Sequence, residues 1–212
     1  MYNPPAFKQT EPEALHALIR EFPFATLVSH GPQGLQASLL PFLLYPDEGQ
    51  HGVLRAHLAR ANPHAAALAE AEACLVIFQG EHGYVSPSWY PSKATTHRTV
   101  PTWNYVTVQA HGQPRLIDAP EALHHLLRDL TSAHEAQRAA PWSIDDAPAD
   151  YIAAQMKAIV GIEIAIERLE GKWKFSQNKD EGDRQGVISG MLSADDAHAH
   201  PALAQRMRKA DQ

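Results

Sequence analysis

The sequence predicts an α+β protein that is mainly β, an antiparallel barrel with helices on its periphery. Six or seven short segments show the apolar or alternating pattern of strands and are separated by Gly and Pro residues. Two or three other segments show helical periodicity behind N-terminal capping signals. The 212 residues contain no internal repeat and no low-complexity tract, so one main domain is expected.

The chain is predicted to open with a helix that lies on the outside of the sheet. Thr10 is the expected N-cap, Glu13 completes a capping box, and Pro23 ends the helix. The apolar side chains at helical spacing are Leu15, Leu18, Ile19 and Phe22.

A hairpin and a third strand are expected next. Residues 25–29 and 35–45 are apolar and are separated by turn residues, and Pro41 indicates a sheet edge or a bulge. Residues 52–58 alternate strictly, so Arg55 and His57 should share the less buried face of their strand.

The remaining elements continue the sheet and cover it. Strands are predicted at 74–79, 83–87, 102–112, 160–167 and 173–175, with a turn at Glu170 and Gly171 before the last one. A capping box at residues 118–121 predicts a helix with one apolar stripe, and a shorter helix is expected over 148–158. The stripe consists of Leu123, Leu126, Leu127 and Leu130.

Charge and cysteine content restrict the classes of function. The net charge of −6 argues against a broadly basic surface, so DNA contact would need a local group of cations, such as the Lys93–Arg98 segment or Arg206, Arg208 and Lys209. Cys74 cannot form an intramolecular disulfide and lies in an apolar run, which predicts a buried thiol. Without a signal segment or a membrane-length apolar run, we expect a soluble cytoplasmic protein that makes no contact with membranes.

Familiar catalytic motifs do not occur. The sequence has no G-x-S-x-G elbow, no Walker loop and no G-x-G-x-x-G fingerprint, so we assign no catalytic residue. His57, His82, His97 and His111 do not have the spacing of a compact ligand motif, and no metal site is predicted.

The most informative segments are the aromatic stretches at 84–90 and 100–105. They hold half of the four Trp and half of the six Tyr residues, together with hydroxyl and amide groups. Rings with a polar tip suit a ligand wall or a subunit interface, although aromatic residues are also enriched in ordinary strands. The polar, basic segment 91–99 between them is typical of a mobile loop over a site.

A candidate anion site lies at residues 55–63. Asn62 is a good N-cap, Pro63 suits the first helical position, and Arg60 and His57 stand beside the free amide groups of the helix start. Most helix starts of this kind bind no ligand, so a purely structural cap is the first explanation, and Arg55 and Arg60 could equally pair with acidic groups.

Taken together, four segments resemble the PaiB family of FMN-binding negative transcriptional regulators. The matching stretches are 57–63, 78–90, 100–105 and 171–178, and the opening residues 1–7 fit as well. The resemblance runs in order from the first residue to about Leu192.

This resemblance implies a split β-barrel of the pyridoxine-phosphate-oxidase type, usually a homodimer with flavin at the subunit interface. It also implies one FMN-binding domain over 1–192, followed by a helical tail over 193–212. By analogy, the phosphate would contact Arg55, His57, Arg60 and Asn62, with Lys93 or Arg98 closing over it. The isoalloxazine would be lined by Ser86, Ser88, Trp89, Trp103, Asn104 and Tyr105, with Gln177 and Asn178 from the last strand.

Three functions follow as expectations. The first is an FMN-binding, homodimeric transcriptional repressor. The second is a flavin-dependent oxidoreductase on the same barrel, in which the flavin would supply the chemistry. The third is a haem-binding or haem-degrading split-barrel protein, with His57 or His97 as the axial ligand. Whether the protein is an enzyme is left open.

Overall fold

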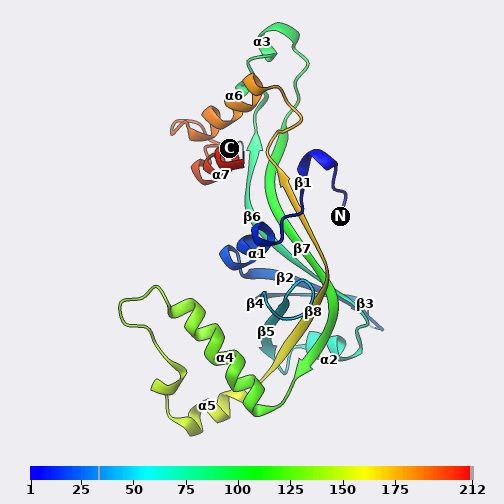
Figure 1. Cartoon of the computed structure of the whole chain (residues 1–212), viewed down its shortest axis with the longest axis vertical. Helices are drawn as coiled ribbons and strands as arrows, with labels where there is room; N and C mark the ends of the chain where they lie inside the picture. Colours follow the sequence, from blue (N-terminus) through cyan, green and yellow to red (C-terminus); the bar gives the residue numbers. More distant parts are fainter. Residues whose placement is uncertain (33, 211–212) are drawn as a thin grey trace. The chain divides into compact units, whose positions relative to one another are not determined.

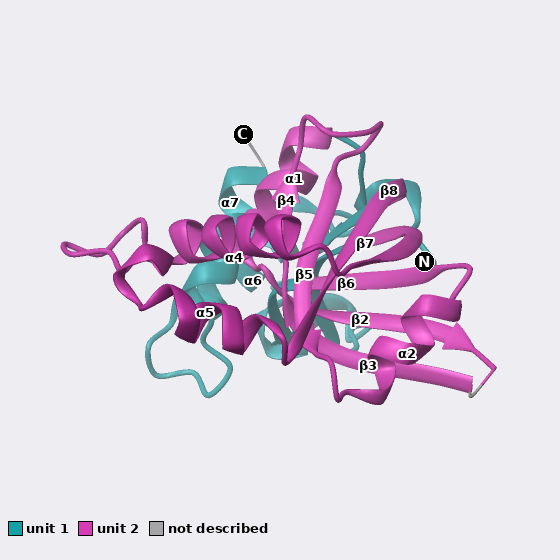
Figure 2. Cartoon of the chain, turned by 90° about the horizontal axis from the view of Figure 1, so that it is seen from below, with its two compact units in different colours: residues 1–11, 79–108, 170–212 teal, residues 12–78, 109–169 magenta. Residues whose placement is uncertain are grey.

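The computed structural model describes residues 1–32 and 34–210, and the chain divides into two compact units (Figures 1 and 2). Unit 1 comprises residues 1–11, 79–108 and 170–212, and unit 2 comprises residues 12–78 and 109–169. The predicted boundary at residue 192 stays a prediction, and residues 211 and 212 of the predicted tail lie outside the described residues. No helix in the described part of the chain is long and apolar enough to cross a membrane.

Eight strands form a sheet in the order β3-β2-β6-β7-β8-β5-β4, and β1 pairs with β8 (Figure 1). The strands are β1 (Lys8–Gln9), β2 (Phe24–Gly31), β3 (Gly34–Pro41), β4 (Leu43–Tyr45), β5 (Val53–Ala59), β6 (Cys74–Val85), β7 (Thr102–Ile117) and β8 (Ile159–Lys174). Since β3 ends at Pro41 and stands at the end of this order, the predicted edge position of that proline is confirmed.

The predicted hairpin is the β2–β3 pair, in register from Phe24 opposite Pro41 to Gly31 opposite Gly34. Gly34 has a φ of 89°, a conformation that favours glycine and allows the tight turn. Alternation buries one face of the hairpin and leaves the other in solvent. The exposed face carries Phe24, Leu35 and Leu39.

The predicted faces of β5 are confirmed. Leu54, Ala56 and Leu58 are buried, whereas Arg55 and His57 are half-buried. Beside this strand, β4 and β8 complete an antiparallel group within unit 2.

The first helix, α1 (Pro12–Glu21), begins two residues after the predicted N-cap. Gln9 Oε1 accepts from the backbone N–H groups of Thr10 and Glu11, so the capping box predicted at Thr10 is wrong. Glu13 instead forms an ion pair with Arg20. The apolar face is as predicted, because Leu15, Leu18 and Ile19 are buried.

Two predictions of paired short strands are wrong, because β6 and β8 are each continuous. Gly83 does not form a turn: a Cβ there would lie 3.1 Å from Leu203 Cδ2, so glycine permits close packing within unit 1. Gly171 lies opposite Gln9 in the β1–β8 ladder, and this pairing keeps the predicted turn extended.

Three helical segments of unit 2 follow the prediction with one correction. They are α2 (Pro63–Glu70), α4 (Pro120–Glu135) and α5 (Ala149–Met156), with the 3-10 turn η3 (Ile144–Asp146) before α5. Leu123, Leu126 and Leu130 are buried as expected. The N-cap of α4 is Ala119, without a side-chain cap, because Asp118 pairs with Arg60 instead, at 2.8 Å.

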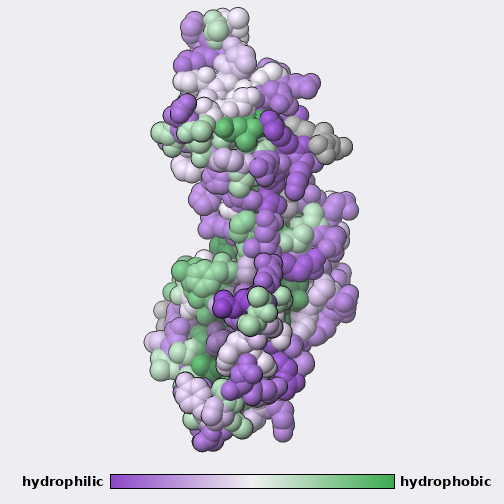
Figure 3. Space-filling model, turned by 90° about the vertical axis from the view of Figure 1, so that its left-hand side faces the viewer, coloured by the Kyte–Doolittle hydropathy of each residue, from purple (hydrophilic) through white to green (hydrophobic). Residues whose placement is uncertain are grey.

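Unit 1 contains the helices α3 (Lys93–Thr96), α6 (Glu181–Leu192) and α7 (Pro201–Ala210), and the turns η1 (Pro5–Phe7) and η2 (Pro87–Trp89). Within the group of cations at the end of α7, Arg206 pairs with Glu81 at 2.7 Å, and Met207 beside it is buried. The face in Figure 3 is largely hydrophilic, with separate hydrophobic patches.

Candidate functional site

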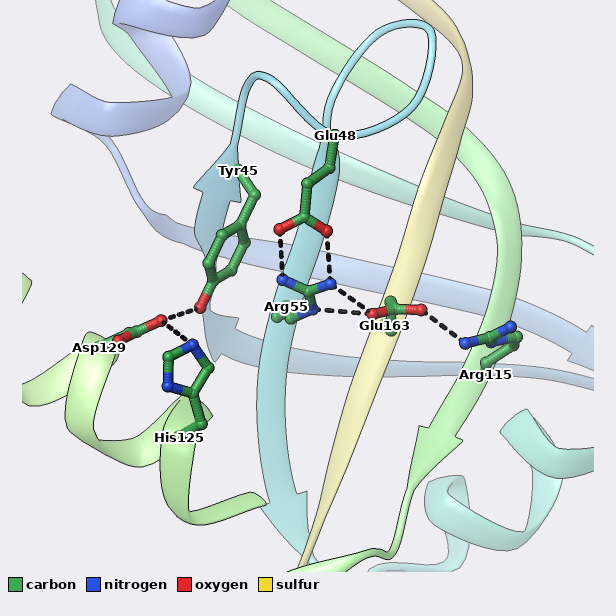
Figure 4. Close-up of polar contacts among 7 residues, drawn as sticks. All are labelled: Tyr45, Glu48, Arg55, Arg115, His125, Asp129 and Glu163. Atoms are coloured by element: carbon green, nitrogen blue, oxygen red, sulfur yellow. Dashed lines mark hydrogen bonds and ion pairs between the residues drawn. The ribbon is translucent and has the colours of Figure 1, made fainter. Parts of the chain in front are cut away.

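Arg55, a predicted phosphate ligand, lies in a network of charges in unit 2 (Figure 4). Its guanidinium donates to both carboxylate oxygens of Glu48, at 3.0 and 2.6 Å, and to Glu163 at 2.8 Å. Glu163 also accepts from Arg115 at 2.8 Å. The hydrogen bonds that Arg55 donates to Glu48 are the largest cause of a raised pKa for Arg55. A phosphate at Arg55 would have to displace one of these carboxylates.

A second chain of contacts joins Tyr45, Asp129 and His125 beside this network (Figure 4). The Tyr45 hydroxyl donates to Asp129 Oδ2 at 2.6 Å, and His125 Nε2 lies 3.3 Å from the same oxygen. Burial, followed by the bond to Asp129, raises the pKa of Tyr45. The Arg55 guanidinium carbon lies 4.2 Å from the centroid of the Tyr45 ring. Sequence reasoning missed this group because Tyr45 is 84 residues from Asp129. The i,i+4 spacing of His125 and Asp129 was the available local signal.

Arg60 is anchored at the end of β5. It donates to the carbonyl oxygens of Ile159, at 2.9 Å, and Lys157, at 3.3 Å, besides its ion pair with Asp118. Its side chain is nevertheless about half exposed, at 48%. Arg60 also borders a pocket of about 960 Å³ along α4, η3 and α5, whose apolar walls include Leu123 and Ile152.

The predicted cap of α2 is confirmed, since Asn62 Oδ1 accepts from the His64 N–H at 3.0 Å. The buried His64 ring lies between two hydroxyls, 2.9 Å from Ser29 Oγ and 2.8 Å from Ser38 Oγ. Burial lowers the pKa of His64. Asn62 therefore has a structural role, and these bonds fix the helix start on the β2–β3 hairpin.

His57 differs from Arg55, Arg60 and Asn62, because its buried Nδ1 has no hydrogen-bond partner among the described residues. Burial lowers the pKa of this histidine, so the neutral ring is favoured. A neutral imidazole with an unused nitrogen can accept from, or donate to, a bound group.

In unit 1, Trp103 is the most exposed of the predicted flavin-wall rings, at 52%. Its ring centroid lies 6.1 Å from that of Tyr84, edge to face, and 6.4 Å from that of His82. Tyr84 in turn lies 4.6 Å from the His198 ring. This group of rings presents an open aromatic surface that a planar ligand or a second subunit could cover.

Trp89, by contrast, is held within unit 1. Its Nε1 donates to Asp196 Oδ2 at 2.9 Å. Two glycines of α6, Gly186 and Gly190, lie against this residue, and a Cβ on Gly190 would be 2.4 Å from its ring. The ring therefore serves to fasten the segment to α6.

The segment predicted as an irregular loop includes the short helix α3 and is attached to α6. Ser92 donates from its N–H and its hydroxyl to the buried Asp183 carboxylate, at 3.0 and 2.7 Å. Lys93 Nζ lies 3.5 Å from Ser88 Oγ, and Ser86 caps η2. Arg98 is exposed beyond this attachment.

The amides predicted to contact the isoalloxazine make mostly local bonds. Asn104 is fully buried and donates to Ser176 Oγ at 3.0 Å. Gln177 accepts from the Phe175 N–H at 2.7 Å and donates to the Trp173 carbonyl at 2.6 Å. Asn178 is exposed. Of these residues, Asn178 has the most accessible side chain.

Two lysines near the end of β8 were missed by sequence reasoning. Lys172 donates to the Tyr2 carbonyl at 2.9 Å, and Lys174 donates to Thr102 Oγ1 at 2.6 Å and to the Trp103 carbonyl. Both ammonium groups lie beside the Tyr105 ring, 5.4 and 6.0 Å from its centroid. The sequence signal for these lysines was their spacing in the Gly171–Asn178 motif. Residues two apart on a strand lie on the same face.

Comparison with known proteins identifies the family. The domain family described as "Putative FMN-binding domain" matches residues 1–168. The protease synthase and sporulation protein PAI 2 of Bacillus subtilis is 31% identical over 199 residues, covering 94% of this chain and 93% of that protein. The chain belongs to the PaiB family. The match confirms the family predicted from the motifs and FMN as the cofactor of that family.

A further sequence relative and two solved structures are also similar to this chain, and the solved structures bear on its fold. An uncharacterized protein of Emericella nidulans is 36% identical, with 90% of each chain covered. The flavocytochrome Anf3 from Azotobacter vinelandii has a TM-score of 0.58 at 16% identity, over 84% of this chain and 75% of that one. The FAD and haem binding protein from Mycobacterium smegmatis has the same score at 19% identity, over 84% and 78%. The predicted fold class, a mainly antiparallel split β-barrel with peripheral helices, is confirmed.

The predicted site residues are divided between the two units. Those in unit 2 are Arg55, His57, Arg60 and Asn62, and the other ten belong to unit 1. Within unit 2, Arg55 and Asn62 make other contacts, while His57 Nδ1 has no hydrogen-bond partner among the residues that the structure describes. The assignment of these residues to the flavin stays a prediction.

Proposed function

We propose that this chain is an FMN-binding, homodimeric negative regulator of transcription that acts in the cytoplasm. The observation that carries the proposal is the family match over residues 1–168, which includes three of the four motif segments found in the sequence. The exposed rings around Trp103 offer a surface on which a flavin could stack.

A homodimer is supported by the outer face of the β2–β3 hairpin. Phe24, Leu35 and Leu39 are 62%, 75% and 61% exposed on this face. The register places Ala37 opposite Val28 between them, so the face is mostly apolar, with Thr26 and His30 as its polar side chains. An apolar face on an edge strand is an aggregation hazard unless something covers it. A second copy of this chain is the proposed cover.

FMN titration tests the cofactor and the predicted site. We expect saturable binding of one FMN per subunit, followed by flavin fluorescence. Trp103→Ala should weaken binding by removing a stacking ring, and Arg60→Ala should weaken it if this cation reaches the phosphate. Trp142→Ala is the matched control, because Trp142 is also an exposed Trp, at 45%, but lies outside the predicted site. Unchanged affinity in both site variants would refute the predicted placement.

The regulatory part of the proposal is supported by the family and by one basic segment. Residues 86–101 contain Lys93, His97 and Arg98 and no acidic residue. If this segment contacts DNA, affinity should fall steeply with salt as counterions are released. Fluorescence anisotropy with labelled DNA at increasing salt tests this, and Lys93→Gln with Arg98→Gln should flatten the dependence. No binding at low salt would contradict direct DNA recognition.

Haem binding is the second candidate, favoured by the unpartnered Nδ1 of His57. The visible spectrum of the purified protein, with FMN and haem titrated separately, distinguishes the two cofactors. A Soret band that is lost in His57→Ala but kept in His97→Ala would support haem at His57. Consumption of reduced nicotinamide only in the presence of FMN would instead support a flavin-dependent oxidoreductase.

A further inference from the structure

Lys172 and Lys174 are cations on one face of β8 without an acidic partner among the described residues. Lys172 is only 7% exposed, yet its ammonium bonds to the Tyr2 carbonyl, a neutral acceptor. Lys174 bonds to a hydroxyl and a carbonyl. Removing an ammonium from water is costly unless an opposite charge compensates for it. The positive charge of each lysine is therefore not compensated by a carboxylate among the described residues.

A third lysine, Lys8, adds positive charge beside Lys172. Lys8 stands directly opposite Lys172 in the β1–β8 ladder, and cross-strand partners share a face of the sheet. Like charges directly opposite one another are destabilising. Lys8 is exposed and has no ion pair among the described residues.

The surrounding segments supply no counter-charge. Residues 1–10, 102–108 and 171–178 contain no Asp or Glu. Glu170, the nearest acidic residue along β8, pairs with the Met1 ammonium at 3.2 Å. The positive charge of Lys172, together with burial, lowers the pKa of Lys174. Burial is the first cause of this shift, and the neighbouring like charge is the second.

The groups around the lysines define the ligand chemistry. The Tyr2 and Tyr105 rings lie 5.4 Å from the Lys172 ammonium, and the Thr102 hydroxyl lies beside Lys174. Two or three ammonium groups and a hydroxyl match the several oxygens of a phosphate, and the rings could contact the organic part of its carrier.

We infer that Lys8, Lys172 and Lys174 form a binding site for the phosphate group of a small molecule. Arg55 and Arg60, the cations predicted to hold phosphate, already have carboxylate partners, whereas these lysines have none within residues 1–32 and 34–210. The phosphate could be that of FMN, in which case the inference rests on the proposed function, or that of a separate phosphorylated ligand. Both sources have the same chemistry at the lysines.

The test compares FMN, riboflavin and inorganic phosphate as probes of the full chain in phosphate-free buffer. Lys174→Gln keeps an amide that can donate to the Trp103 carbonyl, and Lys8→Glu changes an exposed residue, so both should fold. Lys209→Glu is the control, because it makes the same charge change at another exposed lysine without an ion pair among the described residues and lies outside the predicted flavin site.

If FMN supplies the phosphate, both variants should bind FMN roughly tenfold to a hundredfold more weakly, as expected for a lost charge-assisted bond, and bind riboflavin normally. If a separate ligand supplies it, the FMN to riboflavin ratio should stay unchanged while stabilisation by inorganic phosphate is lost. Lys8→Glu should also raise the unfolding temperature without ligand, because it replaces a like-charge pair with an ion pair.

The inference is overturned if none of the three probes distinguishes these variants from the wild type and Lys209→Glu. Should the wild type bind no flavin, the proposed function fails, and the response to inorganic phosphate alone decides whether the lysine site exists. A fall in unfolding temperature in Lys8→Glu without ligand would contradict the like-charge argument.

Discussion

The Trp89 ring occupies the space that a side chain at Gly190 would need. A Cβ at Gly190 would lie 2.4 Å from the ring, and one at Gly186 would lie 2.0 Å from the Trp89 carbonyl oxygen. The contact holds the aromatic stretch at 84–90, which belongs to one of the segments that resemble the family, against α6. It explains why α6 tolerates two glycines in its interior despite their low helix propensity.

Gly190→Ala should destabilise the protein. Added volume in a packed contact typically costs about 1 to 3 kcal/mol, which exceeds the gain of about 1 kcal/mol in helix propensity. Gly182→Ala in the same helix is the control, because its Cβ would meet only Asp180 Oδ1, at 3.4 Å. Urea unfolding checks both. Equal stability of the two variants would show that Trp89 moves aside without cost.

Glu163→Gln should destabilise unit 2 more than Glu48→Gln does. Glu163 accepts from both Arg55 and Arg115 and is 21% exposed, whereas Glu48 is 45% exposed and pairs with Arg55. We expect a loss of about 1 to 2 kcal/mol for the first and below about 1 kcal/mol for the second, as exposed pairs contribute little. Denaturant unfolding at low and high salt gives the comparison. The reverse order would contradict the network drawn in Figure 4.

Stability should fall on acidification because of His64. Burial lowers its pKa in the folded state, so below about pH 6.5 the unfolded state binds more protons than the folded state. The free energy of unfolding should therefore be greatest above this pH, decrease as pH falls from about 6.5 towards the lower folded pKa, and level off below that pKa. His64→Gln should reduce the slope, and His134→Gln, at an exposed position, should not. An unchanged slope in His64→Gln would refute the assignment.

Leu39→Glu should shift the protein from dimer to monomer. Leu39 is 61% exposed on the apolar hairpin face proposed as the subunit interface, and a buried carboxylate there would lack a partner. Sedimentation velocity measures the change. Tyr151→Glu, at a 57% exposed residue on α5, is the control. A wild type that is monomeric, or a variant that remains dimeric, would rule out this face.

Local patterns in the sequence were sufficient for much of the fold. Alternation placed Leu54 and Arg55 on opposite faces of β5, and Asn62 with Pro63 marked the start of α2. They gave wrong predictions at Thr10 and Gly171. The Gln9 side chain accepts from the backbone N–H of Thr10, and pairing with β1 keeps Gly171 in an extended strand. Gln9 lies just outside the capping-box motif at Thr10. The strand that pairs with Gly171 is distant in the sequence, so neither contact is visible in the local pattern.

The candidate site was harder to predict for the same reason. Sequence identified Arg55 as a cation on a half-buried face but could not show that Glu163, 108 residues away, would accept from it. Likewise, nothing local indicates that Asn104 turns inward to Ser176 or that Lys172 bonds to a backbone carbonyl, with no acidic partner in the described part of the chain. Side-chain chemistry can be read from a motif, but the availability of that chemistry depends on contacts across the fold.

Cys74 gives the protein an internal reporter of strand opening. The buried thiol donates to the Gly112 carbonyl at 3.3 Å, and burial raises its pKa to about 12. Because the sequence contains one cysteine, labelling by a thiol reagent can have a single origin. The rate of labelling in the native state would then measure how often β6 and β7 separate at this point, without any added probe. A ligand that slows the labelling of Cys74 reduces the opening of the sheet at this point, even if it binds elsewhere on the molecule.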